Sequence, residues 1–148
     1  KADILGLFIL TQLADSGQLE TGSLEDHYVT FLAGIFRSVR FGAASAHGRA
    51  NMIRFHVFAE HGAFVRNSNG TYQVDMTKMR KAVESLSRRL LTLQGDGDYR
   101  GARKLVDEKG TVTPGLRADL ERVEAAGIPV DIIFRQGIQF LGLPPLGN

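Results

Sequence analysis

The stretch "SAHGRANMIRFHVFAEHG", residues 45–62, predicts a long helix at the middle of the chain and carries three of its four histidines. Ser45 is a favoured N-cap residue, and Gly62 suits the position that follows a helix C-terminus. Residues four apart lie on one face of a helix, so His47 and Asn51 are stacked one turn apart, with Arg54 nearby. This polar face has two interpretations, a patch that contacts substrate or a strip that faces solvent.

The residues before this stretch predict two more helices. Lys1 to about Ala14 has apolar residues in steps of three and four, which is typical of a helix buried on one broad face; these are Ile4, Leu5, Phe8, Ile9 and Leu13. Ser23 and Asp26 have the spacing of a capping box and predict that a second helix begins there. Its apolar stripe is Tyr28, Val29, Leu32, Ile35, Phe36 and Val39.

The residues after Gly62 predict a hairpin and three further helices. Two alternating runs, 63–66 and 71–74, flank Asn69-Gly70, and Asn-Gly is a strong hairpin signal. Asp75 or Thr77 caps a helix that reaches Leu93. Shorter helices are expected over 99–108 and from Thr113-Pro114 to about Ala125, because Thr followed by Pro is a favoured helix start. We expect an extended segment over 128–134 and a loose tail over 138–148.

The pattern predicts a mainly α fold, with about six helices around one core, a small β-hairpin and a late extended segment. The 148 residues suffice for one domain, 1–148. The net charge is only +2, and the densest basic run, residues 78–89, alternates with apolar residues as a solvated helix face does. A nucleic-acid binder would carry a concentrated basic stripe, so we expect no nucleic-acid partner.

The chain contains no cysteine, which excludes disulfides and thiolate chemistry and is typical of a reducing compartment. No apolar run reaches the roughly 18 residues that span a bilayer, so we expect a cytoplasmic protein without a membrane partner.

Two further groups of titratable residues lie on predicted helices. His56, Glu60 and His61 could hold a metal, but histidines five apart do not converge on a regular helix. The alternative to a metal site is that these residues are a surface pair at the end of the helix. Asp119, Glu121 and Glu124 are expected to face solvent on their helix.

Several stretches, taken together, resemble the C-terminal half of the catalytic region of dipeptidyl peptidase III-like zinc metallopeptidases. The resemblance is closest to bacterial zinc-dependent hydrolases of that family, some of which carry a MutT/Nudix label. Lys1-Ala2-Asp3 is similar to the end of the family motif Glu-Glu-Xaa-Arg-Ala-Glu/Asp, with Lys in place of Arg. Residues 45–62 resemble the family's Ala-His helix, and residues 85–114 resemble a Leu-rich helix, a Gly-Asp turn and a Gly-Xaa-Arg helix.

The resemblance implies roles for particular residues. His47 is similar to an active-site histidine that contacts substrate or stabilises the transition state. Asp3, the last acid of the motif, would orient a metal ligand. Arg49 and Asn51 are weaker candidates for substrate contact, and Asn51 stands where the animal enzymes have Arg. The metal ligands and the general base would lie upstream of Lys1, so zinc is expected in the full-length protein and not in this chain.

We therefore expect the C-terminal fragment of a zinc-dependent peptidase, inactive alone, whose partners are a peptide substrate and the N-terminal half of the same protein. A helix that starts at Lys1 without a capping residue fits a fragment. Apolar residues nearly all round residues 4–13 predict an exposed patch through which the fragment dimerises. The alternative is a non-enzymatic helical protein-interaction domain.

Overall fold

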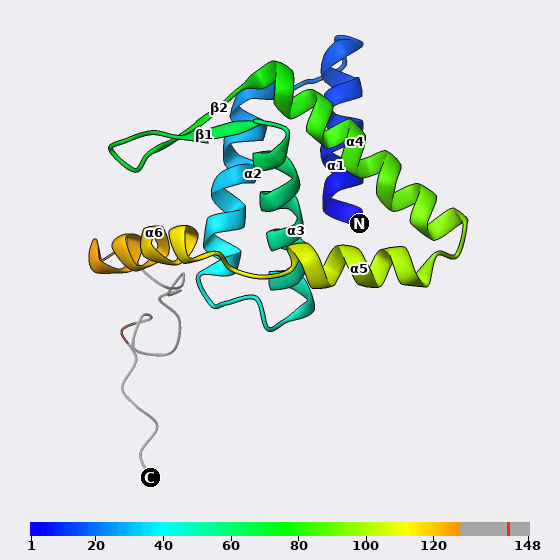
Figure 1. Ribbon diagram of the computed structural model, residues 1–148. Coiled ribbons are helices and arrows are strands. Elements are labelled where there is room, and N and C mark those ends of the chain that lie inside the picture. The colour runs from blue at the N-terminus through cyan, green and yellow to red at the C-terminus, as the bar shows by residue number, and fades with distance from the viewer. Residues whose placement is uncertain (128–141, 143–148) are drawn as a thin grey trace.

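The computed structural model describes residues 1–127 and 142, and within them the fold is mainly α. Six helices and one two-stranded antiparallel hairpin follow one another in the order of the chain (Figure 1). The elements are α1 (Ala2–Asp15), α2 (Leu24–Val39), α3 (Ala46–Glu60), β1 (Phe64–Arg66), β2 (Tyr72–Val74), α4 (Met76–Gly95), α5 (Tyr99–Lys109) and α6 (Pro114–Ala125). This confirms the predicted fold class. The extended segment expected over 128–134 and the loose tail over 138–148 lie outside the described residues, apart from position 142.

Local side-chain caps set most of the helix starts. The Ser23 hydroxyl accepts from the Asp26 amide, and the Asp26 carboxylate accepts from the Ser23 amide, so the predicted capping box forms. Ser45 accepts from the Gly48 amide at 3.0 Å. Of the two caps considered for α4, Asp75 is the one that forms, because its carboxylate accepts from the Lys78 amide. Each cap satisfies a backbone N–H that has no partner within its helix.

The hairpin forms as the Asn-Gly signal predicted. β1 and β2 pair antiparallel, with Phe64 opposite Val74 and Arg66 opposite Tyr72. Gly70 closes the turn with φ of 79°, a left-handed value that a residue with a Cβ rarely adopts.

The α3 helix lies at the centre of the bundle. It packs against α2, α4 and α5, and its C-terminal end leads into the hairpin (Figure 1). Phe55 of α3 contacts both α2 and the hairpin. Its ring lies edge-on to that of Phe36 on α2, with 5.8 Å between the centroids, and is tilted against that of Phe64 on β1, with 4.9 Å between the centroids. The core is built from buried side chains of all six helices, among them Ile4, Leu7, Tyr28, Leu32, Ile35, Met52, Phe58, Met79, Val83, Leu86, Leu105 and Leu116.

Two expected apolar stripes are only partly buried. On α1 the buried residues are Ile4, Leu7 and Thr11, whereas Ile9 and Leu13 are 57% and 37% exposed. The broad-face prediction for this helix was therefore partly wrong, because α1 is covered by α4 and α2 and its remaining side stays open. On α2, Val29 is also exposed.

No helix in the described part of the chain is long and apolar enough to cross a membrane.

Candidate functional site

The first turn of α3 presents His47, and a close backbone approach fixes where that turn lies. Gly48 follows His47 and packs against the loop before the helix. A Cβ at Gly48 would lie 2.6 Å from the Gly42 carbonyl oxygen and 2.9 Å from the Ala43 Cα. Only glycine permits this contact without movement of the loop. The His47 imidazole itself is exposed.

The Arg54 guanidinium connects two of the predicted site residues. Its Nη2 donates to the Asp3 Oδ2 at 2.6 Å, and its Nη1 donates to the Asn51 Oδ1 at 2.5 Å. The other end of the Asn51 amide, Nδ2, donates to the Ser38 Oγ at 2.6 Å. We call these four residues, Ser38, Asn51, Arg54 and Asp3, the Arg54 network. It ties α1, α2 and α3 together.

Burial is uneven within the Arg54 network. The Arg54 side chain is 8% exposed and lies 5.9 Å from the ring centroid of Phe31, whereas the Asp3 side chain is 60% exposed. A guanidinium stays charged at any ordinary pH, so its burial requires an anionic partner, and Asp3 supplies one. The Asp3 carboxylate is thereby oriented while it stays accessible to solvent.

The predicted site residues of α3 fall on two sides of the helix, whereas Asp3 lies on α1. His47, Asn51 and Arg54 follow one another at intervals of four and three residues and share a face. Arg49 lies toward α5, where a Cβ at Gly110 would meet the Arg49 Cγ at 3.4 Å. The structure thus links Asp3 and Asn51 through Arg54, with Asn51 one turn from His47, and leaves Arg49 elsewhere. The helix spacing predicts that Arg54 lies near this face, but no local pattern predicts its bond to Asp3, because Asp3 is 51 positions away.

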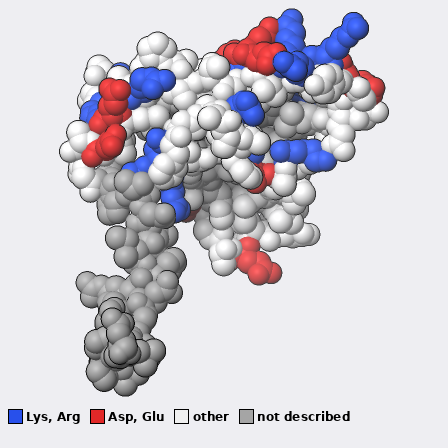
Figure 2. Space-filling model, turned by 90° about the horizontal axis from the view of Figure 1, so that it is seen from below, with Lys and Arg blue, Asp and Glu red and all other residues white. Residues whose placement is uncertain are grey.

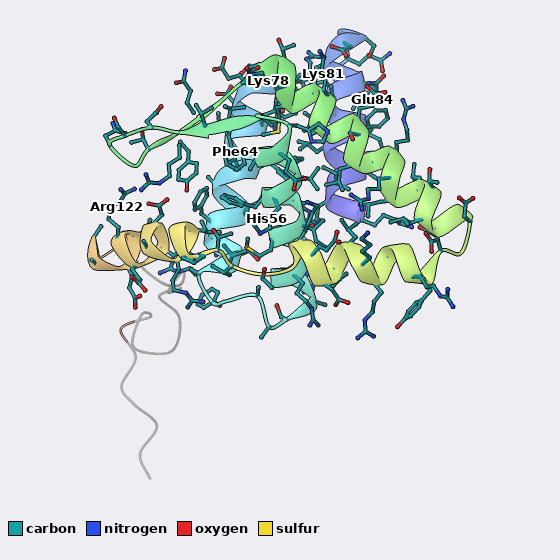
Figure 3. All side chains as sticks on the ribbon, in the orientation of Figure 1. His56, Phe64, Lys78, Lys81, Glu84 and Arg122 are labelled. Atoms are coloured by element: carbon teal, nitrogen blue, oxygen red, sulfur yellow. The ribbon has the colours of Figure 1, made fainter. Side chains whose placement is uncertain are left out.

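The His56, Glu60 and His61 side chains are each engaged separately. The His56 Nε2 lies 2.9 Å from the Thr111 carbonyl oxygen, and the His61 Nδ1 lies 2.8 Å from the Val57 carbonyl oxygen (His56 is labelled in Figure 3). Glu60 forms an ion pair with Lys109. Across residues 1–127 and 142, no three His, Cys, Asp or Glu side chains lie close enough together to hold a metal ion.

A second polar cluster joins the hairpin to α6. Arg66 donates to both carboxylate oxygens of Asp119 at 2.7 Å, and the Tyr72 hydroxyl donates to Asp119 at 2.6 Å. Arg122 donates to the Gly70 carbonyl oxygen and lies beside the hairpin turn (Figure 3). We call Arg66, Tyr72, Asp119 and Arg122 the Asp119 cluster. The expectation that Asp119 faces solvent was wrong, because α6 packs its carboxylate beneath the hairpin.

The Asp119 cluster has shifted pKa values with clear causes. The hydrogen bonds from Arg66 lower the pKa of Asp119 from 3.8 to about 2, with help from Tyr72. Burial and the bond to Asp119 raise the pKa of Tyr72 to about 12. Beside it, a hollow of about 510 Å³ lies between α2, the hairpin and α6.

Charges of both signs stand together on the face of the molecule shown in Figure 2. On α5 the basic residues Arg103 and Lys104 pair with Asp107 and Glu108 one turn further along. Such pairs are typical of a solvated helix face.

No family model matches the chain. A protein of Arabidopsis thaliana named Nudix hydrolase 3 is 46% identical over 132 residues, which cover 89% of this chain and 17% of that protein. The structure of dipeptidyl-peptidase III from Corallococcus sp. strain EGB matches with a TM-score of 0.79 and 38% identity over 89% of this chain. That of DPP III from Caldithrix abyssi matches with a TM-score of 0.83 and 32% identity over 95% of this chain.

The chain spans 17% of the Arabidopsis protein and 24% and 26% of the two dipeptidyl-peptidase III chains. The names of these relatives point to two different families. In sequence and in fold, the chain is thus similar to about a quarter of a dipeptidyl-peptidase III.

Proposed function

We propose that this chain is the part of a dipeptidyl peptidase III-type peptidase that contacts and orients the peptide substrate. The observation that carries the proposal is the juxtaposition on α3 of an exposed imidazole, His47, and a polar network that ends in an oriented carboxylate, Asp3. The similarity in fold to two dipeptidyl-peptidase III structures supports it.

In this proposal His47 donates a hydrogen bond to the substrate backbone or to the oxyanion that develops during hydrolysis. Such donors are effective when their position is fixed before the reaction, because no reorganisation is then needed. The contact of Gly48 with the preceding loop fixes the turn that carries His47. Arg49 is a weaker candidate for substrate contact, because it lies toward α5 and not on the face of His47. Asn51 is a weaker one, because both ends of its amide are already bonded within the chain.

We propose zinc as a cofactor of the full-length protein and not of this chain alone. The described residues contain no set of ligands that fits a metal ion, so we assign no step to a metal here. In this proposal the zinc ligands of the full-length protein lie upstream of Lys1, as the family resemblance implies. Inactivity of the chain alone, pairing with an N-terminal half and a cytoplasmic location stay predictions of the same proposal.

The test is a peptidase assay of the full-length protein on a dipeptide-releasing substrate, with and without a chelator. We expect activity that the chelator removes and that His47→Ala lowers by about 100-fold, as expected for loss of a transition-state donor. The matched control is His61→Ala, which removes an exposed histidine from the other end of α3. Equal activity of wild type and His47→Ala would contradict the assigned role.

A second candidate function rests on the name of the Arabidopsis relative, at 46% identity. In this candidate function the full-length protein is a Nudix-type hydrolase. Full-length protein without peptidase activity and with a hydrolase activity of that type would favour it.

A third candidate is a non-enzymatic interaction domain, favoured by the exposed Ile9 and Leu13 on α1. The same two side chains would carry the predicted dimer. Sedimentation of the chain at high concentration tests it, since a monomer throughout contradicts a self-associating surface.

A further inference from the structure

The family resemblance assigns no role to Arg54, and the sequence placed it only near the polar face of His47 and Asn51. It is the most buried cation among the side chains around His47 and Asp3. Arg54 as a whole residue is 7% exposed, and its side chain lies where α1, α2 and α3 meet. A buried guanidinium at such a junction needs hydrogen-bond partners, because an unpaired donor in an apolar setting is costly, and Asn51 and Asp3 each accept one bond from it.

From these contacts we infer that Arg54 is a positioning residue, which fixes the Asp3 carboxylate and the Asn51 amide relative to the turn that carries His47. The inference rests on the proposed function for its catalytic consequence. Arg54 acts through Asp3 and Asn51 and does not touch substrate.

The planar fork of the guanidinium makes this role specific. Nη1 and Nη2 are held in one plane, so when Nη2 binds Asp3 the direction of Nη1 is fixed as well. Nη1 then selects the orientation of the Asn51 amide, since only its oxygen accepts a hydrogen bond. This orientation turns the amide nitrogen toward Ser38 on α2. A lysine ammonium carries the same charge but lacks the fork.

The Arg54 network also connects α1 and α3, which are far apart in the sequence. Asp3 stands in the first turn of α1, and α1 packs mainly against α4 and α2. The Arg54–Asp3 bond therefore ties the start of α1 directly to α3. Because Asp3 lies on α1 and His47 lies on α3, any shift of α1 relative to α3 would change the distance between the Asp3 carboxylate and the turn that carries His47.

A matched control exists on the other end of α1. Arg80 of α4 pairs with Asp15 through Nη1 and Oδ1 at 2.5 Å, and both side chains are about half exposed. Arg80→Met removes an arginine-aspartate pair to the same helix and leaves the Arg54 network intact.

The experiment compares Arg54→Met, Arg54→Lys and Arg80→Met in the full-length protein. For peptide hydrolysis we expect Arg54→Met to lower kcat by 10- to 100-fold with KM within about threefold of wild type, as for the loss of residues that orient an active-site group. Arg54→Lys should fall between Arg54→Met and wild type, and Arg80→Met should match wild type. Asp3→Asn combined with Arg54→Met should lower kcat by less than the product of the two single effects, because the two residues share one contact.

Crystal structures of the same variants give a readout that does not depend on activity. In Arg54→Met the Asp3 carboxylate and the Asn51 amide should rotate away from their wild-type positions, while the α1, α2 and α3 backbones stay in place. Unchanged side chains in that variant overturn the inference, as does a kcat of Arg54→Met within about twofold of wild type or an equal loss in Arg80→Met. If the wild type hydrolyses no peptide, the proposed function fails, and the crystal structures alone decide whether Arg54 positions Asp3 and Asn51.

Discussion

The Arg54 network and the Asp119 cluster each pair a buried charge with an exposed charge of opposite sign, but the buried charge is positive in the first and negative in the second. In the first, the cation is buried and its carboxylate partner is exposed, at 8% for Arg54 and 60% for Asp3. In the second, the carboxylate is buried and the cation is exposed, at 4% for Asp119 and 47% for Arg66. A charge that leaves water must be paired and hydrogen-bonded, and both sites meet that requirement.

The difference lies in what each arrangement leaves accessible. Asp119 accepts three hydrogen bonds from Arg66 and Tyr72, so its oxygens are occupied and its role is to hold α6 on the hairpin. Asp3 accepts one bond from Arg54 and keeps much of its surface in solvent. A buried carboxylate thus serves as a structural tie, whereas an exposed one held by a buried cation is oriented and still available to a further partner.

The largest effect is expected from Asp119→Ala. The change leaves the Tyr72 hydroxyl and the Arg66 guanidinium without their acceptor and should lower the free energy of unfolding by about 3 kcal/mol. Urea denaturation of wild type and variant measures this difference. Hydrogen exchange should locate it at α6 and the hairpin. A loss below about 1 kcal/mol would mean that Asp119 is no stronger a tie than a surface pair.

Acid should weaken the Asp119 cluster over a defined range of pH. The pKa of Asp119 is lowered from 3.8 to about 2 in the fold, so the unfolded chain binds this proton more readily than the folded one. The stabilisation is therefore complete above pH 3.8 and is lost as the pH falls toward 2. Urea denaturation at several pH values should show the advantage of wild type over Asp119→Asn shrinking across that range. A constant advantage would contradict the lowered pKa.

Arg54→Met should lower the free energy of unfolding by a smaller amount, about 1.5 kcal/mol. Its partner Asp3 is exposed and regains water when the cation is gone, whereas Asn51 loses a charge-assisted bond. Thermal or urea unfolding measures the change. A loss larger than that of Asp119→Ala would reverse the contrast drawn between the two sites.

Tyr72→Phe removes one of the three bonds to Asp119 and keeps the ring that packs on Phe36 and Phe64. We expect a loss of about 1 kcal/mol, the usual value for one hydrogen bond. Since Arg66 remains bound, α6 should stay attached, and exchange of its amides should rise only slightly. Release of α6 in this variant would show that the hydroxyl, and not Arg66, is the main tie.

The smallest effect is expected from Arg80→Met, within about 0.5 kcal/mol of wild type. Its pair with Asp15 is half exposed on both sides, and such pairs contribute little to stability. Measured beside Arg54→Met by the same unfolding assay, it separates the effect of burial from the effect of losing an arginine on the α1 interface.

Much of the candidate site could not be predicted, although its helix could. The spacing of His47, Asn51 and Arg54 places them on one face from sequence alone. The pairing of Arg54 with Asp3 could not be foreseen, because nothing local fixes where α1 lies relative to α3. The same holds for Asp119, whose position on an otherwise charged helix is typical of a solvent-facing residue. Only the packing of α6 under the hairpin removes it from water.

The sequence by itself determined the helices, their caps and the hairpin turn. Ser23, Ser45 and Asp75 act on backbone groups three residues away, and Asn69-Gly70 sets its own turn, so these features need no distant partner. The tertiary structure decided which charges are buried and which stay accessible. That outcome depends on how helices far apart in the chain are packed, because burial is a property of the assembled core and is not fixed by the order of residues within any one segment.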